Sequence, residues 1–371
     1  MLYIDYSAYR TFMECAWKWY EKYVNKRQKA WMGMRKDAMA LGTLVHDGLR
    51  HFYANGPDIS FPLISMDAVR ITNPTPELLQ QANMLLAGYA QWYGQDPWTM
   101  TALEKPLMRP LCGDVTLVAK VDGYFQIMEP TEIIVGPGSA RMTMMLEPGW
   151  YSLEHKTKDS MISVGHWMQQ WQVNLQASFQ LLALEHMLNV EHQGNDHALV
   201  RGVLVNVLEK PRAYVPERKC KGCGETSEMT AWLSKPSDGL FCCPWCGYEQ
   251  ELKPYKPKVE HRPEYWRMLV TRTDEQLHRH LLMITDTSQD MAYMIDRAKY
   301  APDAEDVERL GRMAGLCSID PNLDACVDVM RRKQCEYYDV HNGPQVLNTL
   351  EEQGFVEAED YVGEGRVGYA Q

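Results

Sequence analysis

Two acidic residues and a lysine lie in two predicted strands. Asp122 lies in the apolar run 117–125, and Glu154 and Lys156 lie in the next apolar run that follows it. A period of two places Glu154 and Lys156 on one face of their strand, with His155 on the other. Two carboxylates can hold a divalent cation, and a lysine can steer a water or help to deprotonate it. These residues therefore suit metal-assisted phosphodiester hydrolysis, although an E-x-K pattern alone is also typical of a surface ion pair.

Four cysteines occur in two pairs, and each pair is followed by glycine. They are Cys220, Cys223, Cys243 and Cys246. In each pair a tight turn presents two thiolates, and the glycine supplies a permissive backbone. Four thiolates leave no open position for catalysis, so the sequence predicts a structural zinc ribbon within residues 211–261.

Basic residues precede and follow the pairs of cysteines. Lys221 is among those that lead into the segment, and Arg267 and Arg272 are among those that follow it. They form either a solvated surface or a patch that contacts DNA. Trp232 and Trp245 would suit stacking on bases, whereas a simple clip on a long loop is the other interpretation of the ribbon.

Composition limits the class of protein. The chain has 371 residues, of which 45% are hydrophobic and 23% charged, which predicts a globular protein of roughly two domains, or one large domain with an insertion. A net charge of −11 argues against a general nucleic-acid coating protein, but it allows a local basic channel. The ten cysteines, and a sequence without a signal peptide or an apolar run of about 18 residues, predict a reducing, cytoplasmic location.

The elements that must position these residues follow from apolar periodicity and from turn residues. In chain order we first expect a helix capped by Ser7, with Cys15 near its apolar face, then helices over 40–56 and about 75–96. Two strands joined by a turn near Gly113 and Asp114 follow, and then the strand with Glu154. The last elements expected are a helix from about His166 to Leu188, a strand over 198–210, and a long helix opened by Thr273 or Asp274. Helices and strands that alternate in this way indicate an α/β fold.

These segments, in this order, resemble the PD-(D/E)XK nuclease superfamily and its RecB-like branch, which includes CRISPR-associated exonucleases and many phage-encoded relatives. The motifs that carry the resemblance are YSAYRTFMECAWKWY at 6–20, GTLVHDGLRHF at 42–52, Asp122 in its strand, SLEHKT at 152–157, WQVNLQASFQLLALEH at 171–186 and ACVDVMRRKQCEYYDVH at 325–341. The resemblance implies a restriction-endonuclease-like fold, with a mixed central sheet flanked by helices. It implies a nuclease core over 1–210, an inserted zinc ribbon over 211–261, and a helical region over 262–371 that completes the core.

The resemblance also implies the site. The catalytic residues would be His46, Asp122, Glu154, Lys156 and Gln176, and the first three would bind Mg²⁺ or Mn²⁺. His46 ends the phrase G-T-x-x-H, and Gln176 matches the glutamine of a Q-x3-Y motif. Gln180 stands where that motif has tyrosine, which leaves the role of the tyrosine vacant or moves it elsewhere. Glu104 lies where the family often has an acidic residue on its first strand, and would support the metal ligands without binding the ion.

A 4Fe–4S cluster is implied as well, held by Cys15 and by cysteines near the other end of the chain. The last spacing of the family is kept after Cys335, but His341 stands in the final place. The ligands are therefore Cys15, Cys326, Cys335 and His341, or the same three cysteines with Cys317. A zinc site or free thiols at these positions is the alternative, because thiolate is the usual cluster ligand.

The expected function is that of a metal-dependent deoxyribonuclease, an exonuclease acting in recombination, repair or phage DNA processing. DNA is the expected partner, and no membrane association is expected. Since the sequence has no G-x4-G-K-[ST] motif, a helicase or recombination protein would be a separate chain. The alternative is a catalytically silent DNA-binding or assembly module of the same fold, but the presence of Asp122, Glu154 and Lys156 together favours the enzyme.

Overall fold

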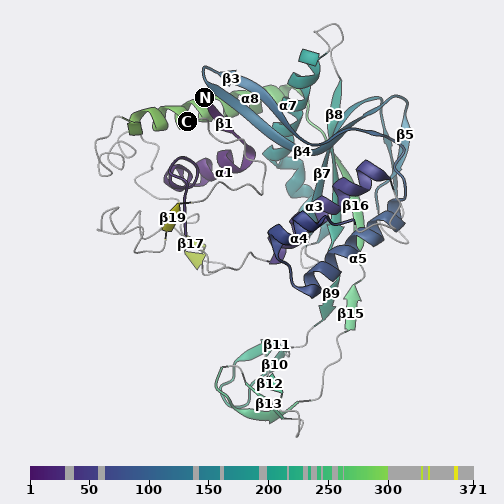
Figure 1. Ribbon diagram of the computed structural model, residues 1–371, viewed down its shortest axis with the longest axis vertical. Coiled ribbons are helices and arrows are strands. Elements are labelled where there is room, and N and C mark those ends of the chain that lie inside the picture. The colour runs from purple at the N-terminus through teal and green to yellow at the C-terminus, as the bar shows by residue number, and fades with distance from the viewer. Residues whose placement is uncertain are drawn as a thin grey trace.

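The computed structural model describes residues 1–29, 37–56, 63–136, 142–158, 163–191, 199–214, 217–228, 233–234, 240–243, 245–252, 258–261, 263–299, 327–328, 333–334 and 355–357. At its centre is a six-stranded mixed sheet with helices on both faces (Figure 1). This confirms the α/β architecture expected from the sequence.

The sheet has the strand order β1 (Leu2–Ile4), β4 (Val115–Ile127), β7 (Gly149–Lys158), β8 (Val200–Glu209) and β16 (Glu264–Val270), and β3 (Met100–Cys112) also pairs with β4. The pairs β1–β4 and β7–β8 are parallel, and the other pairs are antiparallel. The β3–β4 hairpin turns at Gly113 and Asp114, as the sequence predicts.

β4 has two partners along one edge. Leu2–Ile4 of β1 pairs with the start of β4, at 115–117, whereas β7 pairs with its far end, from Gly123 to Ile127. Residues 118–122 lie between these two ladders, where β4 and β7 part. This opening in the sheet is where Asp122 lies.

One face of the sheet is covered by α3 (Asp37–Asn55), α4 (Met66–Thr72) and α5 (Pro76–Tyr93) (Figure 1). Buried leucines of α3 and α5 form their shared core, with Leu208 of β8 beneath them. A Cβ on Gly48 of α3 would overlap the methyl carbons of Leu86 on α5. Gly48 therefore lets α3 and α5 pack closely at this point without a shift of the Leu86 side chain.

The other face is covered by α1 (Tyr6–Glu14), α7 (Leu175–Glu191) and α8 (Asp274–Lys299). Their buried side chains form one core with β4, in which the rings of Phe179 and Tyr9 make a T-shaped contact with their centroids 5.5 Å apart. After α1 come the short helix α2 (Ala16–Trp19) and a π-helical turn, η1 (Tyr20–Val24). The start of α8 is as predicted, since Thr273 Oγ1 accepts the N–H of Gln276 at 3.2 Å.

Two helix boundaries differ from the sequence predictions. The helix expected over 166–188 is two helices, α6 (Val164–Val173) and α7, because Asn174 has an extended backbone and its Oδ1 accepts the N–H of Gln176 at 2.9 Å. That side chain caps the second helix instead of continuing the first. Similarly, the N-cap of α1 is Asp5 rather than Ser7, since Asp5 Oδ1 accepts the N–H of Ala8 at 2.6 Å.

The segment inserted between β8 and β16 projects away from the sheet (Figure 1). It begins and ends in the paired strands β9 (Arg212–Tyr214) and β15 (Lys258–His261). Beyond them lie β10 (Glu217–Lys219), β11 (Thr226–Glu228), β12 (Leu233–Ser234), β13 (Leu240–Cys242) and β14 (Glu249–Glu251).

Three further strand pairs complete the described chain: β5 (Thr131–Ile134) with β6 (Thr143–Leu146), β17 (Val327–Asp328) with β18 (Lys333–Gln334), and β2 (Arg27–Lys29) with β19 (Phe355–Glu357). The last pair joins segments from near the two ends of the chain. Within the ranges given above, no helix combines the length and the apolar character needed to cross a membrane.

Candidate functional site

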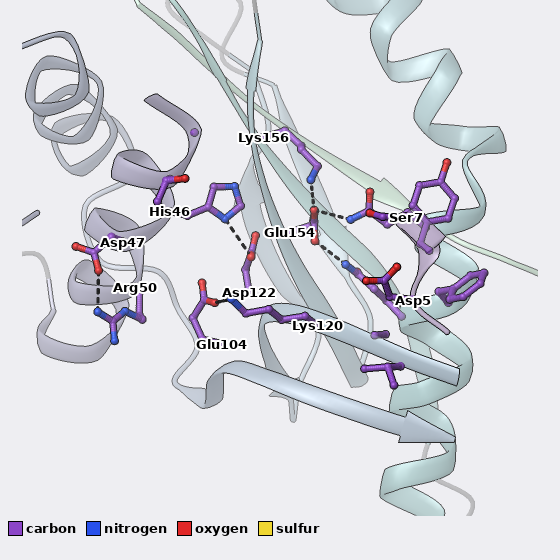
Figure 2. Close-up of a pocket in the computed structure, with 18 of the residues that line it drawn as sticks. Asp5, Ser7, His46, Asp47, Arg50, Glu104, Lys120, Asp122, Glu154 and Lys156 are labelled. Carbon is purple, nitrogen blue, oxygen red and sulfur yellow. Dashed lines mark hydrogen bonds and ion pairs between the residues drawn. The ribbon is translucent and has the colours of Figure 1, made fainter. Parts of the chain in front are cut away.

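A cavity of about 620 Å³ opens where β4 parts from β7. Its walls come from both faces of the sheet, since α3 contributes His46 (Figure 2) and α7 contributes Gln176. The start of α1 closes it on another side with Asp5 and Ser7. All five residues expected to be catalytic line this one cavity: His46, Asp122, Glu154, Lys156 and Gln176.

Asp122 is held through both of its carboxylate oxygens. Oδ1 lies 3.1 Å from Nδ1 of His46, and Oδ2 accepts the backbone N–H of His155 at 2.6 Å. Burial alone would raise the pKa of Asp122, but the neighbouring imidazole of His46 holds that pKa well below its usual range. Burial likewise opposes protonation of His46, yet the Asp122 carboxylate raises the pKa of His46 above its ordinary value. The two side chains thus form a charge-matched pair at the floor of the cavity.

Glu104 completes a cluster of possible metal ligands. It lies in β3 across from Asp122, and its φ of +50° is a left-handed conformation that a residue within a strand seldom adopts. One ligand atom each from His46, Glu104 and Asp122 can be chosen so that all lie within 4.8 Å of one another. An imidazole nitrogen and two carboxylates in this arrangement fit a divalent cation. Oε2 of Glu104 also lies 2.6 Å from Nζ of Lys120 (Figure 2).

Glu154 lies in the same cavity but has different neighbours. It is only 2% exposed, forms an ion pair with Lys156, and accepts hydrogen bonds from Gln176 at 2.9 Å and Gln180 at 2.5 Å. Burial raises the pKa of Glu154. The Lys156 side chain is 31% exposed. Partial burial favours its neutral form, but the Glu154 carboxylate raises the pKa of Lys156 above its ordinary value, so it remains an ammonium ion. Its Nζ lies 5.6 Å from the ring centroid of Trp171.

The structure thus brings the residues that the sequence singled out into one cavity, but the contacts among them were not expected. His46 and Asp122, two of the three expected metal ligands, belong to the close cluster, and the third member is Glu104, which the sequence suggested only as a support. The signal for Glu104 was its position on the first strand, where the resembling family often has an acidic residue, and its backbone conformation could not be predicted from that. Gln180, which departs from the tyrosine of the Q-x3-Y motif, donates a hydrogen bond to Glu154.

The amides on the two helices do not act together as one polar face. Gln172, Gln176 and Gln180 are spaced by four in the sequence and would share one side of a continuous helix, but Gln172 belongs to α6 and donates to the carbonyl of Leu269 at 3.3 Å. The break at Asn174 turns it away from the other two.

The lining of the cavity is acidic. Of the described side chains around it, five are carboxylates and three are lysine or arginine, namely Asp5, Asp47, Glu104, Asp122 and Glu154 against Arg50, Lys120 and Lys156. Such a cavity attracts cations and repels a polyanion. A bound divalent cation would therefore favour the approach of a phosphate group.

The four cysteines of the insertion form a second cluster. The four sulfurs of Cys220, Cys223, Cys243 and Cys246 all lie within 4.8 Å of one another. Sγ of Cys220 is 3.6 Å from that of Cys246, and Sγ of Cys223 is 3.8 Å from that of Cys243. These distances are too long for disulfides. A tetrahedral ion with Zn–S bonds of about 2.3 Å needs sulfurs about 3.8 Å apart, so the cluster fits a single zinc-like ion.

The knuckle backbones are built as the sequence predicts. Gly224 and Gly247, which follow the second cysteine of each pair, have φ of +77° and +71°. The surroundings of Cys220 favour its neutral thiol, but backbone N–H groups of Cys223 and Gly222 point at its sulfur and lower its pKa to about 6. A thiolate is the form that binds a metal. Trp245 is 70% exposed beside this cluster, while Trp232 lies outside the described residues.

The expected iron–sulfur ligands are only partly within the described chain. Cys15 lies at the junction of α1 and α2, where its sulfur accepts the N–H of Lys18 at 3.4 Å. Cys317, Cys326, Cys335 and His341 lie outside the described residues. The cluster therefore stays a prediction.

Arg267 has a different place from the one that the sequence suggested. It was counted among basic residues on the surface or against DNA, but it is 3% exposed and its guanidinium forms an ion pair with buried Asp96. Arg272 is partly buried and donates to the carbonyl of Asn174 at 2.9 Å.

A comparison with protein-family models finds no match to this chain, and a comparison with curated protein sequences finds none either.

Proposed function

We propose that this protein is a metal-dependent deoxyribonuclease of the PD-(D/E)XK type. One observation carries the proposal: the cluster of His46, Glu104 and Asp122 lies in the same cavity as the Glu154–Lys156 ion pair. Carboxylates that can hold a divalent cation, beside an ammonium ion, are the groups that hydrolysis of a phosphodiester needs. We assign an exonuclease role in recombination, repair or phage DNA processing from the resemblance of the sequence motifs.

Hydrolysis forms a bond from a water oxygen to phosphorus and breaks the bond to one bridging oxygen, which takes up a proton. His46, Glu104 and Asp122 would hold the cation, Mg²⁺ or Mn²⁺, with Glu154 able to join them. When bound, the cation supplies Lewis-acid activation of the phosphate and of water. Lys156 offers a positive charge to a non-bridging phosphate oxygen, and the amides of Gln176 and Gln180 keep Glu154 in one orientation.

The two other metal groups have structural roles in this proposal. A zinc ion on the four cysteines would hold the inserted segment together, since the buried cluster among the described residues of that segment consists of Cys220 and Cys243 packed with Phe241 and Leu252. A 4Fe–4S cluster at Cys15 would join the two ends of the chain. The pairing of β2 with β19 supports this, because it already brings a C-terminal segment to the region just after Cys15.

The test is cleavage of end-labelled linear DNA and of circular DNA in Mg²⁺ or Mn²⁺. Wild-type protein should degrade the linear DNA and leave the circle intact. Asp122→Asn and Glu104→Gln keep the shapes of the side chains and should abolish cleavage. Asp67→Asn is the matched control, because Asp67 is a carboxylate on the surface whose side chain is 78% exposed.

Unchanged cleavage by both cavity variants would overturn the assignment. DNA binding by a wild-type chain that cleaves neither substrate with either ion would instead identify a catalytically silent DNA-binding module of the same fold. Cleavage of the circle would keep the nuclease and correct the exonuclease role.

A further inference from the structure

We propose that His155, held by a buried polar cage around Arg267, is a positioning residue for Asp122 and so sets the affinity of the cavity for its metal. The Arg267 cage consists of Tyr53, Tyr89, Asp96, Asn206 and Arg267. The inference rests on the proposed nuclease function for its meaning, but the metal affinity that tests it can be measured without cleavage.

The first step is the contact between His155 and Asp122. The β4–β7 ladder ends at the pair Gly123 and Leu153. Beyond it, the Asp122 carboxylate takes the place of a ladder carbonyl and accepts the His155 N–H at 2.6 Å. The position of the His155 backbone therefore fixes the position of Oδ2 of Asp122, and Oδ1 faces His46.

The second step is what holds His155. Its side chain points to the face of the sheet opposite Glu154 and Lys156, and it is 2% exposed. The ring stacks on Tyr53 at 5.5 Å between centroids, with an angle of 19°. Its Nδ1 lies 3.2 Å from the amide nitrogen of Asn206, which places an acceptor at that ring atom. His155 is thus fixed by a stacked ring on one side and a directional hydrogen bond on another.

The third step is the cage itself. Asn206 Oδ1 accepts Nε of Arg267 at 2.9 Å, and Asp96 accepts both terminal nitrogens of Arg267 at 2.7 and 2.8 Å. Tyr89 accepts a further hydrogen bond from Arg267 at 3.0 Å and one from Asn206 at 2.8 Å. A bidentate ion pair that is fully buried and hydrogen-bonded has few alternative arrangements. The cage is therefore a rigid support.

Register places the cage directly behind the cavity. His155 pairs with Asn206 across β7 and β8, and Asn206 pairs with Arg267 across β8 and β16, so the three residues form one row across the sheet. Tyr53, whose hydroxyl donates to Asp96 at 2.8 Å, lies on α3, the same helix as His46. The cage thus supports both members of the His46–Asp122 pair. Groups that orient metal ligands typically change metal affinity or activity by about 10–100-fold when they are mutated.

A cage that only stabilises the fold would not change the metal affinity of the cavity. Two substitutions of His155 distinguish a positioning role from a role in stability alone. His155→Phe keeps an aromatic ring on Tyr53 but removes the nitrogen that Asn206 contacts. His155→Asn removes most of the ring but keeps an acceptor near the position of Nδ1. The control is Lys158→Met with Glu209→Gln, which removes a buried ion pair of 3.0 Å between the same strands, β7 and β8, away from Asp122.

The experiment measures the Mn²⁺ affinity of each full-length protein by titration calorimetry, its thermal melting, and kcat and KM on linear DNA. We expect His155→Phe to bind Mn²⁺ about 10–100-fold more weakly and to lower kcat with little change in KM. His155→Asn should recover a large part of the affinity. The control should melt at a lower temperature with Mn²⁺ affinity unchanged.

Wild-type Mn²⁺ affinity and kcat in His155→Phe would overturn the proposal, as would a loss of affinity in the control as large as in His155→Phe. A wild-type chain that binds Mn²⁺ but cleaves no DNA would refute the proposed function alone, since the affinity series would still decide the role of His155. A wild-type chain that binds no Mn²⁺ in the cavity would refute both.

Discussion

The side-chain amide of Gln180 donates a hydrogen bond of 2.5 Å to Oε2 of Glu154. Gln176, one helical turn earlier, donates one of 2.9 Å to Oε1. The other end of Gln180 is fixed as well, because its Oε1 accepts the hydroxyl of Ser152 at 3.1 Å. Both oxygens of a buried carboxylate are therefore satisfied by one helix, and the orientation of Glu154 depends on how α7 lies on β7.

Substituting these two glutamines should have different effects. Gln180→Leu leaves an oxygen of a buried carboxylate without its amide donor, which costs about 1–3 kcal/mol in the free energy of unfolding. Gln176→Leu, nearer to the open cavity, should cost less stability but lower the cleavage rate by about 10–100-fold. Denaturant unfolding and cleavage rates measure the two effects. Gln172→Leu on α6 is the control and should leave cleavage intact; equal rates in Gln176→Leu and wild type would show that Gln176 has no part in the site.

Zinc in the inserted segment should be measurable by elemental analysis. We expect one zinc ion per chain at the four cysteines, absent when Cys220 and Cys223 are both changed to serine. Because two of the ligands, Cys220 and Cys243, are the buried residues of the cluster described in this segment, its structure should be lost with the metal, while the sheet keeps its melting transition. Cys242→Ser is the matched control, and it should keep the zinc. A well-folded protein that contains no zinc would contradict the assignment.

Two neighbouring tyrosines should respond in opposite ways to the loss of their hydroxyls. Among the described residues the buried hydroxyl of Tyr93 has no hydrogen-bond partner, although its ring stacks on Arg267 at 3.6 Å. Tyr93→Phe keeps the ring and should leave the free energy of unfolding unchanged or raise it. Tyr89→Phe removes the acceptor of Arg267 and Asn206 and should lower it by about 1–3 kcal/mol. A similar loss in both variants, in chemical denaturation, would contradict the hydrogen-bond assignment.

Alkaline pH should weaken the same region. Burial raises the pKa of Tyr89 to about 12, against the effect of Arg267, whereas an unfolded tyrosine has a pKa of about 10. The folded chain therefore keeps a proton that the unfolded chain has lost. The stabilisation is complete below about pH 10 and is lost as the pH rises towards 12. Tyr89→Phe should show a shallower decline in stability over this range, and an identical slope would contradict the assignment.

An iron–sulfur cluster should make anaerobically purified protein brown. Cys15→Ser should lose the colour and also stability, since a link across so long a loop is worth on the order of 4–5 kcal/mol by the estimate for disulfides. If His341 is the fourth ligand, His341→Cys should keep the colour and Cys317→Ser should have little effect. Colourless protein with two zinc ions would instead establish a second zinc site.

The sequence by itself determined the elements with short-range causes. Period-two and period-three-to-four patterns gave β8, α5 and α8 near their observed limits, and Thr273 marked the start of α8. The two cysteine knuckles were also local, because each holds its two cysteines and its glycine in one turn. In such cases the residues that fix a feature lie within a few positions of one another.

The helix break at Asn174 shows where local reasoning failed. Periodicity continues through this residue, but its side chain caps the following helix at Gln176. A side chain that can both continue a helix and cap the next one leaves the choice to packing, and here the break lets α7 lie over Glu154.

Only the tertiary structure decided the composition of the site. Glu104 joins His46 and Asp122 because β3 lies across from β4 and takes a left-handed turn of the backbone there. Arg267 shows the same limit, because a basic residue beside an insertion looks like solvated surface in a sequence. It is buried because the fold places Asp96, 171 positions away, against its guanidinium. Whether a charge can be buried depends on the partner that packing supplies, and that partner is not a local property of the chain.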